Sequence, residues 1–185
     1  LIMIKEFSIN YSDKKLLTIY DKIRDYPWQS MPNVDHWKYG TSHKYLKELC
    51  DYWVKDFNWK IHEELINSFS NFKTNVDDID IHFIKETGSG DNPKPLLLMH
   101  GWPGSIVEFL EIINPLAHPE KFGGKIEDAF TVIAPSLPGF GFSSSPNKPI
   151  GPRKIAKILN KLMTENLNYK NYVAQGGDWG ATIAN

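Results

Sequence analysis

The chain has 185 residues, of which 41% are hydrophobic and 23% are charged, and its formal net charge is −1. This composition is typical of a globular protein with a sizeable core, and it excludes a disordered or low-complexity chain. Because the charge is balanced and no block of Lys or Arg occurs, we expect no surface for nucleic acid, and a small neutral ligand fits better.

The first part of the chain is predicted to be helical. Ser12 and Ser42 are suitable N-caps for two helices, and Asn58 is suitable for a third. In each segment the apolar residues recur near the helical period, and Pro27 should end the first segment. We therefore predict three short helices before the pattern changes near residue 70.

The second part of the chain is predicted to form a sheet. From Phe72 the apolar period changes to two, which predicts a hairpin that turns at Asp77–Asp78. Two continuous apolar runs, Leu96–Met99 and Phe130–Ala134, predict strands that are buried on both faces. Tyr172–Gln175 predicts a last short strand.

Helices are predicted between these strands. Ser105 and Glu108 have the spacing of a capping box, for a helix that Pro115 should end. Gly151 and Pro152 suit the N-cap and the first residue of another helix. This alternation of strands and helices predicts an α/β fold with an open, mostly parallel sheet.

A strand-to-helix turn, Gly176-Gly177-Asp178-Trp179-Gly180, has the form of a nucleophile elbow with Asp in place of Ser. Gly176 and Gly180 would let the chain close tightly around a strained residue 178. The helix start would keep Asp178 ionised, and a carboxylate there can attack a carbon atom to form an ester. We therefore predict that Asp178 is a nucleophile; the alternative is a tight structural turn.

A second loop supports this interpretation. His100-Gly101-Trp102-Pro103-Gly104 ends a buried strand and precedes a capped helix, as an oxyanion loop does. We expect the backbone N–H groups of Trp102 and Trp179 to converge on the oxygen of an ester at Asp178.

Three residues of this loop are predicted to shape it. Gly101 and Pro103 form the tight turn, and we expect the Trp102–Pro103 peptide bond to be cis. His100 is predicted to brace the loop through hydrogen bonds; the alternative is that it acts as the catalytic base.

Other site types are not expected. The remaining histidines lack the spacing of metal ligands, so we predict no metal site. Gly139-Phe140-Gly141 lacks the third glycine of a dinucleotide fingerprint, so we predict no cofactor. His82 is interpreted as a packed or surface histidine of its strand.

Two features of the sequence bear on where the protein is located in the cell. Its apolar runs fall far below the roughly 20 residues that a membrane-spanning helix needs. Leu1–Ile4 is too short for the apolar region of a signal peptide. We expect an intracellular protein, either cytoplasmic or, through an anchor upstream of Leu1, associated with the endoplasmic-reticulum membrane.

Three motifs carry a resemblance to a known family. His100–Ser105, Pro135–Ser143 and Gln175–Gly180 resemble the successive signatures of microsomal-type epoxide hydrolases, including juvenile hormone epoxide hydrolases. The front of the chain is similar to the N-terminal region of that family, for example at Phe57-Asn58-Trp59 and Ile79–Ile84.

This resemblance implies an α/β-hydrolase fold that is truncated just after the nucleophile elbow. Residues 1–70 would be a helical N-terminal meander, and residues 71–185 would be the first part of the core. The reaction implied converts a lipophilic epoxide and water to a vicinal diol through an ester on Asp178. Because the family's lid tyrosines, acidic triad member and base histidine follow the nucleophile, we expect the chain as given to be incomplete for catalysis.

Two other functions remain open at this stage. A haloalkane dehalogenase would use the same aspartate and oxyanion hole but expel halide. A non-catalytic, truncated paralogue would only bind lipophilic ligands or a partner.

Overall fold

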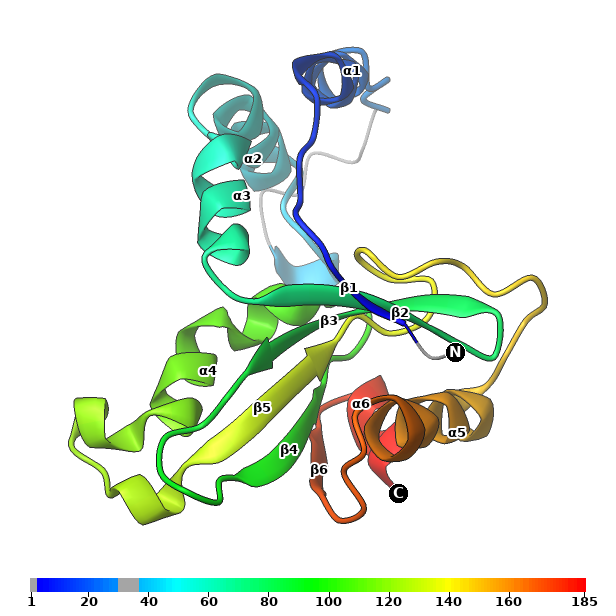
Figure 1. Cartoon of the computed structure of the whole chain (residues 1–185). Coiled ribbons are helices and arrows are strands. Elements are labelled where there is room, and N and C mark those ends of the chain that lie inside the picture. The colour runs from blue at the N-terminus through cyan, green and yellow to red at the C-terminus, as the bar shows by residue number, and fades with distance from the viewer. Residues whose placement is uncertain (1–2, 30–36) are drawn as a thin grey trace. The chain divides into compact units, whose positions relative to one another are not determined.

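The computed structural model describes residues 3–29 and 37–185, which divide into two compact units (Figure 1). The helical unit lies within residues 9–64, and the sheet unit comprises residues 3–8 and 65–185. The sequence suggested a division near residue 70. The residues before 9 belong with the sheet because the strand β1, Ile4–Glu6, pairs with a strand of that unit.

The helical unit contains α1 (Asp13–Arg24), the 3-10 turn η1 (Trp37–Tyr39), α2 (His43–Lys55) and the start of α3 (Trp59–Asn67). Both predicted serine caps are confirmed, because each hydroxyl accepts a backbone N–H from the first turn of its helix. The side-chain oxygen of Asn58 likewise accepts the N–H of Lys60, at 3.0 Å.

A buried carboxylate organises the helical unit. Glu63 accepts hydrogen bonds from the backbone N–H of Tyr11 at 2.7 Å, the indole N–H of Trp59 at 2.9 Å and the ammonium of Lys60 at 2.8 Å. Burial alone would raise the pKa of Glu63, but these three hydrogen bonds together hold it below its ordinary value. The charged carboxylate therefore ties the segment before α1 to α3.

The sheet unit is built on six strands in the order β1-β2-β3-β5-β4-β6. β2 and β3 form the predicted hairpin, and both turn residues, Asp77 and Asp78, have positive φ angles of 50° and 64°. β1, β2, β3 and β5 pair antiparallel in turn, whereas β4 pairs parallel with both β5 and β6. The strands after β1 are Asn71–Val76 (β2), Ile79–Glu86 (β3), Lys94–Met99 (β4), Phe130–Pro135 (β5) and Val173–Gly176 (β6).

Helices cover both faces of this sheet. α4 packs against β5 and β3, α6 packs against β6 and β4, and α5 packs against α6. On one side Ile158 and Leu159 of α5 join a cluster with Leu97 and Met99, which are alternate residues of β4. The helical elements are η2 (Ile106–Phe109), α4 (Leu110–Ala117), η3 (Pro119–Phe122), η4 (Ile126–Asp128), α5 (Pro152–Lys161), the π-helical turn η5 (Leu162–Asn166) and α6 (Trp179–Ala184).

The predicted capping box and the predicted start of α5 are confirmed, but the box caps the 3-10 turn η2, so α4 begins only at Leu110, and one predicted helix end is wrong. Ser105 and Glu108 form the capping box, and Gly151 with Pro152 opens α5. The helix does not stop at Pro115 but continues to Ala117. A proline removes only its own N–H bond, and here it does so in the last turn, which His118 closes through its N–H to the Asn114 carbonyl.

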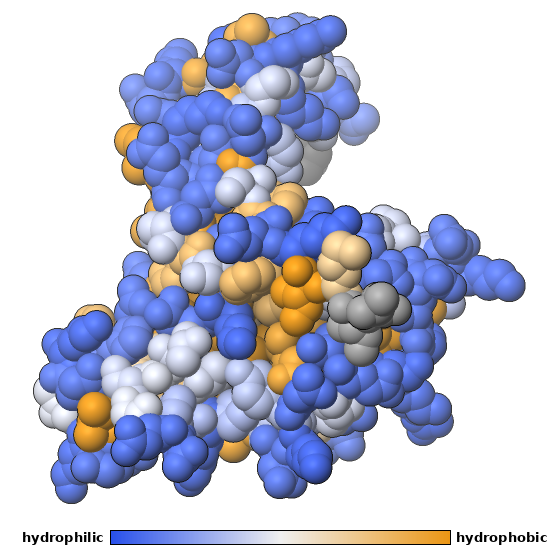
Figure 2. Space-filling view, viewed as in Figure 1, coloured by the Kyte–Doolittle hydropathy of each residue, from blue (hydrophilic) through white to orange (hydrophobic). Residues whose placement is uncertain are grey.

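The surface of the sheet unit agrees with the balanced composition. Its face seen in Figure 2 is mainly hydrophilic, and apolar side chains show on it in a central patch and at a few separate places. Within residues 3–29 and 37–185, no helix combines the length and the apolar character that crossing a bilayer requires.

Candidate active site

Asp178 lies at the tip of a sharp turn between β6 and α6. Its backbone has φ 50° and ψ −122°, a conformation that residues with a side chain rarely adopt, so the turn is strained at this residue. Its side chain makes no capping hydrogen bond to α6. The carboxylate is therefore held out of the helix and remains available to another molecule.

The electrostatics of the turn favour an ionised carboxylate. The backbone N–H of Trp102 donates to Oδ1 of Asp178 at 2.9 Å. The backbone N–H of Trp102, and then that of the adjacent Trp179, lower the pKa of Asp178 below its ordinary value, against a smaller opposing effect of burial. The two N–H groups singled out in the sequence thus both act on this carboxyl group.

The loop from His100 to Gly104 brings the Trp102 N–H to this position. The Trp102–Pro103 peptide bond is cis, as predicted. Gly101 packs so closely against Asp178 that a Cβ atom on the glycine would lie 2.5 Å from the Cβ atom of the aspartate. A glycine is therefore needed there for the loop and the elbow to meet.

His100 is fully occupied by backbone groups. Its Nε2 accepts the N–H of Leu137 at 3.1 Å, so its Nδ1 carries the proton and donates to the carbonyl of Gly101 at 2.9 Å. Burial lowers the pKa of His100 and favours this neutral form. Neither ring nitrogen is left to accept a proton from a water molecule at Asp178.

An apolar cavity of about 660 Å³ adjoins the two tryptophans. Its wall includes Trp102, Leu137, Phe140, Ile150, Trp179 and Ile183. Several of these residues belong to the Pro-rich segment between β5 and α5, which includes the motif Pro135–Ser143 but for which no role in a site was predicted. The density of Pro, Gly and Phe at 138–152 was the available signal, because such a segment forms a loop with apolar side chains.

The sequence predicted no metal site. Among the described residues, no group of three or more His, Cys, Asp or Glu side chains is arranged to hold a metal ion. His36, one of the histidines considered, lies outside the described residues.

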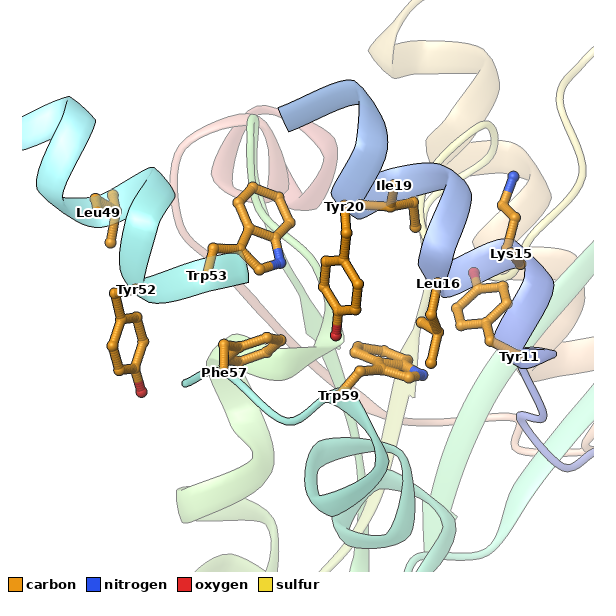
Figure 3. A pocket seen from close by; sticks show the side chains of 10 residues that line it. All are labelled: Tyr11, Lys15, Leu16, Ile19, Tyr20, Leu49, Tyr52, Trp53, Phe57 and Trp59. Carbon is orange, nitrogen blue, oxygen red and sulfur yellow. The ribbon is translucent and has the colours of Figure 1, made fainter. Parts of the chain in front are cut away.

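The helical unit contains an apolar pocket of its own, of about 600 Å³ (Figure 3). Side chains from α1, α2, the segment that joins α2 to α3 and the start of α3 converge on it, among them Leu16, Tyr20, Trp53, Phe57 and Trp59. None of its lining residues belongs to the sheet unit that carries Asp178.

Comparison with known proteins identifies relatives over the whole chain. The family model described as "Epoxide hydrolase N terminus" matches residues 4–109, and that described as "alpha/beta hydrolase fold" matches residues 94–185. Epoxide hydrolase 1 of Oryctolagus cuniculus is 38% identical over 97% of this chain, which covers 40% of that protein. The chain thus spans about 40% of the length of the curated relatives it matches.

Two solved structures are similar in both fold and sequence. Juvenile hormone epoxide hydrolase from the silkworm Bombyx mori superposes with a TM-score of 0.86 at 34% identity, over 99% of this chain and 43% of that one. The epoxide hydrolase of Aspergillus niger gives a TM-score of 0.87 at 28% identity, over 99% of this chain and 48% of that one.

Proposed function

The chain belongs to the epoxide hydrolase family and has the α/β-hydrolase fold, and from this premise we propose that the whole protein converts lipophilic epoxides to vicinal diols through an ester on Asp178. The observation that carries the proposal is the hydrogen bond from the Trp102 N–H to Oδ1 of Asp178. It leaves the other carboxylate oxygen as the nucleophile.

In the first step, that oxygen attacks one carbon of the epoxide. The bond between this carbon and the ring oxygen breaks, and the ring oxygen keeps the electron pair and takes up a proton. The product is a hydroxyalkyl ester of Asp178. The lowered pKa of Asp178 supports this step, because only the ionised carboxylate is nucleophilic.

In the second step, water attacks the carbonyl carbon of the ester and loses a proton to a base. The carbonyl oxygen becomes an oxyanion, which the N–H groups of Trp102 and Trp179 would stabilise. Collapse of this intermediate expels the alcohol oxygen, which takes up a proton to give the diol and restores the carboxylate. Because both ring nitrogens of His100 are occupied, the base is a different group; the family resemblance assigns it, with its acidic partner and the lid tyrosines, to later parts of the protein.

The substrate class follows from the cavity beside the nucleophile. Its wall is formed by aromatic and aliphatic side chains such as Phe140 and Ile150, and it adjoins the two oxyanion donors. An apolar substituent on the epoxide would be buried there, while the ring oxygen would lie at the polar turn.

The test is a single turnover of the complete protein in water enriched in ¹⁸O, with enzyme in excess over a lipophilic epoxide. Because water attacks the carbonyl carbon, the label should enter the Asp178 carboxylate, and mass spectrometry of the peptide that contains it will detect this. Label that appears only in the diol would contradict the proposal. Release of halide from a haloalkane, with no diol from any epoxide, would instead assign a dehalogenase.

A further inference from the structure

Two buried histidines hold adjacent residues at the end of β5. Nδ1 of His82 lies 2.9 Å from the hydroxyl of Ser136, and Nε2 of His100 accepts the N–H of Leu137 at 3.1 Å. His82 has no exposed surface, and His100 is 1% exposed. The hydrogen bonds of both rings are therefore screened from water.

The proton of His82 is fixed by Asn71. Both hydrogens of the Asn71 amide nitrogen go to backbone carbonyls, those of Ile66 and Phe69, each at 2.8 Å. The amide oxygen is left to face Nε2 of His82 at 2.9 Å, so this nitrogen carries the proton. Nδ1 must then accept a hydrogen bond from the Ser136 hydroxyl.

Both the backbone and the side chain of Ser136 are fixed by their neighbours. Its backbone N–H donates to the carbonyl of His82 at 2.9 Å. The hydroxyl of Ser143 donates to the Ser136 carbonyl at 2.7 Å and accepts the N–H of His82 at 2.9 Å. A Cβ atom on Gly141 would lie 2.8 Å from the Ser136 hydroxyl oxygen, so the loop closes on this side chain as well.

The hydrogen bonds continue from Leu137, the residue after Ser136, to the nucleophile. Leu137 fixes His100 by its N–H, and His100 in turn holds the carbonyl of Gly101. The following residue, Trp102, presents its N–H to Asp178. A continuous series of hydrogen bonds and single peptide units therefore joins His82 to the candidate oxyanion hole.

We propose that His82 is a positioning residue for the oxyanion hole, which it orients through Ser136, Leu137 and His100. His82 contacts no reacting atom and donates nothing to the substrate. The inference rests on the proposed function, since it assigns the Trp102 N–H to the oxyanion of the second step. It adds a residue from the β2–β3 hairpin, outside the three motifs, to the machinery of the site.

The two steps of the reaction should respond differently to loss of this positioning. The Trp102 N–H is needed most when charge develops on the ester oxygen, so a misplaced loop should slow ester hydrolysis more than ester formation. Removal of an oxyanion donor slows a reaction by about 100-fold or more, and we expect an indirect displacement to cost about 10-fold. The ester on Asp178 should accumulate as a result.

The experiment compares His82→Phe and Ser136→Ala with a control, His118→Phe, in the complete protein. Phenylalanine keeps the ring of His82 and removes its hydrogen bonds, while Ser136→Ala removes only the hydroxyl between the two histidines. His118 is a suitable control because it also makes two hydrogen bonds, to Ser89 and Glu86, within the sheet unit. Rapid quenching followed by mass spectrometry measures the ester and the diol separately.

We expect both test variants to hydrolyse the ester about 10-fold more slowly, with ester formation within about 2-fold of the parent, and the control to keep the parental ratio. Equal slowing of the two steps, or no change in either, would overturn the proposal. If His82→Phe does not fold, Ser136→Ala decides the question alone.

A second measurement keeps this inference separate from the proposed function. ¹⁵N NMR of the His100 ring and hydrogen exchange at the Leu137 amide report the positioning directly, whether or not diol is formed. Ser136→Ala should shift the His100 signals and speed exchange at Leu137, while His118→Phe should do neither. Unchanged signals in Ser136→Ala would refute the role of His82, and an inactive parent would refute only the proposed function.

Discussion

Gly176 and Gly180 lie against one another across the turn that carries Asp178: a Cβ atom on Gly176 would be 2.2 Å from the carbonyl carbon of Gly180. Gly180 is equally constrained on its other side, where a Cβ atom would lie 2.1 Å from the carbonyl oxygen of Met99. The two glycines allow β6, α6 and the end of β4 to meet at one point. This close approach sets the position of the nucleophile relative to the oxyanion loop.

Gly176→Ala should therefore destabilise the protein and displace Asp178. Overpacking of this kind costs about 1–3 kcal/mol, and a displacement of about 1 Å at a reacting group can cost about 100-fold in rate. Urea unfolding and single-turnover ester formation measure the two effects. The matched control is Gly177→Ala, since a Cβ atom on Gly177 would meet nothing within 4 Å. Equal stability of the two variants would contradict this account of the turn.

The pH dependence of ester formation should reflect the N–H donors at Asp178. Because these donors lower the pKa of Asp178, the carboxylate stays ionised as the pH falls through the ordinary value of 3.8 and is lost only below it. Single turnovers of the complete protein started by a brief pH jump should place the acid limb of ester formation below 3.8. Asp178→Asn should form no ester at any pH. An acid limb at or above 3.8 would show that the donors do not act on the nucleophile.

The tip of the β2–β3 hairpin is held to α5 by charge. Lys154 and Lys161 both pair with Asp77, through its two carboxylate oxygens. The first of these hydrogen bonds and then the second lower the pKa of Asp77. The stability they provide is therefore present above the ordinary pKa of 3.8 and is lost as the pH falls through the lowered value.

Asp77→Asn should lower the midpoint of thermal unfolding by about 2 °C near pH 7, and less at high salt, because exposed ion pairs are weak and screened. Asparagine tolerates the positive φ of this position, so the substitution removes the charge without straining the turn. Asp78→Asn is the control, since the neighbouring residue shares the conformation and both lysines pair with Asp77. Equal midpoints for the two variants would refute a role for the ion pairs.

His82 should make the protein sensitive to mild acid. Burial, with a smaller contribution from Lys73, lowers the pKa of His82 from 6.5 to about 3 in the folded protein. Between these values the unfolded chain binds a proton that the folded protein excludes, so the free energy of unfolding falls as the pH falls below 6.5.

The slope of this loss should be about 1.4 kcal/mol per pH unit between pH 6.5 and 3. The free energy of unfolding of His82→Phe, measured with urea over the same pH range, should depend on pH less steeply than that of the parent, by this amount. A parental slope in His82→Phe would mean that His82 is protonated in the folded protein.

Much of the fold could be predicted because its signals are local. The caps at Ser12 and Ser42, the turn at Asp77–Asp78 and the start of α5 each depend on the chemistry of a few adjacent residues. β1 was missed because a strand of three residues is too short to show a period, and it forms only by pairing with β2. A local signal for it does not exist in the sequence.

The candidate site, like the fold, could be predicted where its signals are local. The elbow and the oxyanion loop can be recognised in the sequence from the glycines near Asp178 and His100. The two loops lie side by side because they follow β4 and β6, which are adjacent parallel strands. The network of His82 was not predictable. Alternation in β3 places His82 on the face opposite Ile81, but only the pairing of β3 with β5 brings Ser136 over it.

The pairing of β1 with β2 closes a long loop of chain that contains the whole helical unit. Its ends are held together by three residue pairs, from Ile4 with Thr74 to Glu6 with Phe72, and by the N–H of Phe7, which donates to the Asn71 carbonyl at 2.9 Å. The entropy lost in closing a flexible loop grows slowly with its length, by about 0.6 kcal/mol for each doubling. A change in the length of the chain within this loop should therefore cost the pairing of β1 with β2 little, so the edge of the sheet and the fold around Asp178 can be kept while the loop varies.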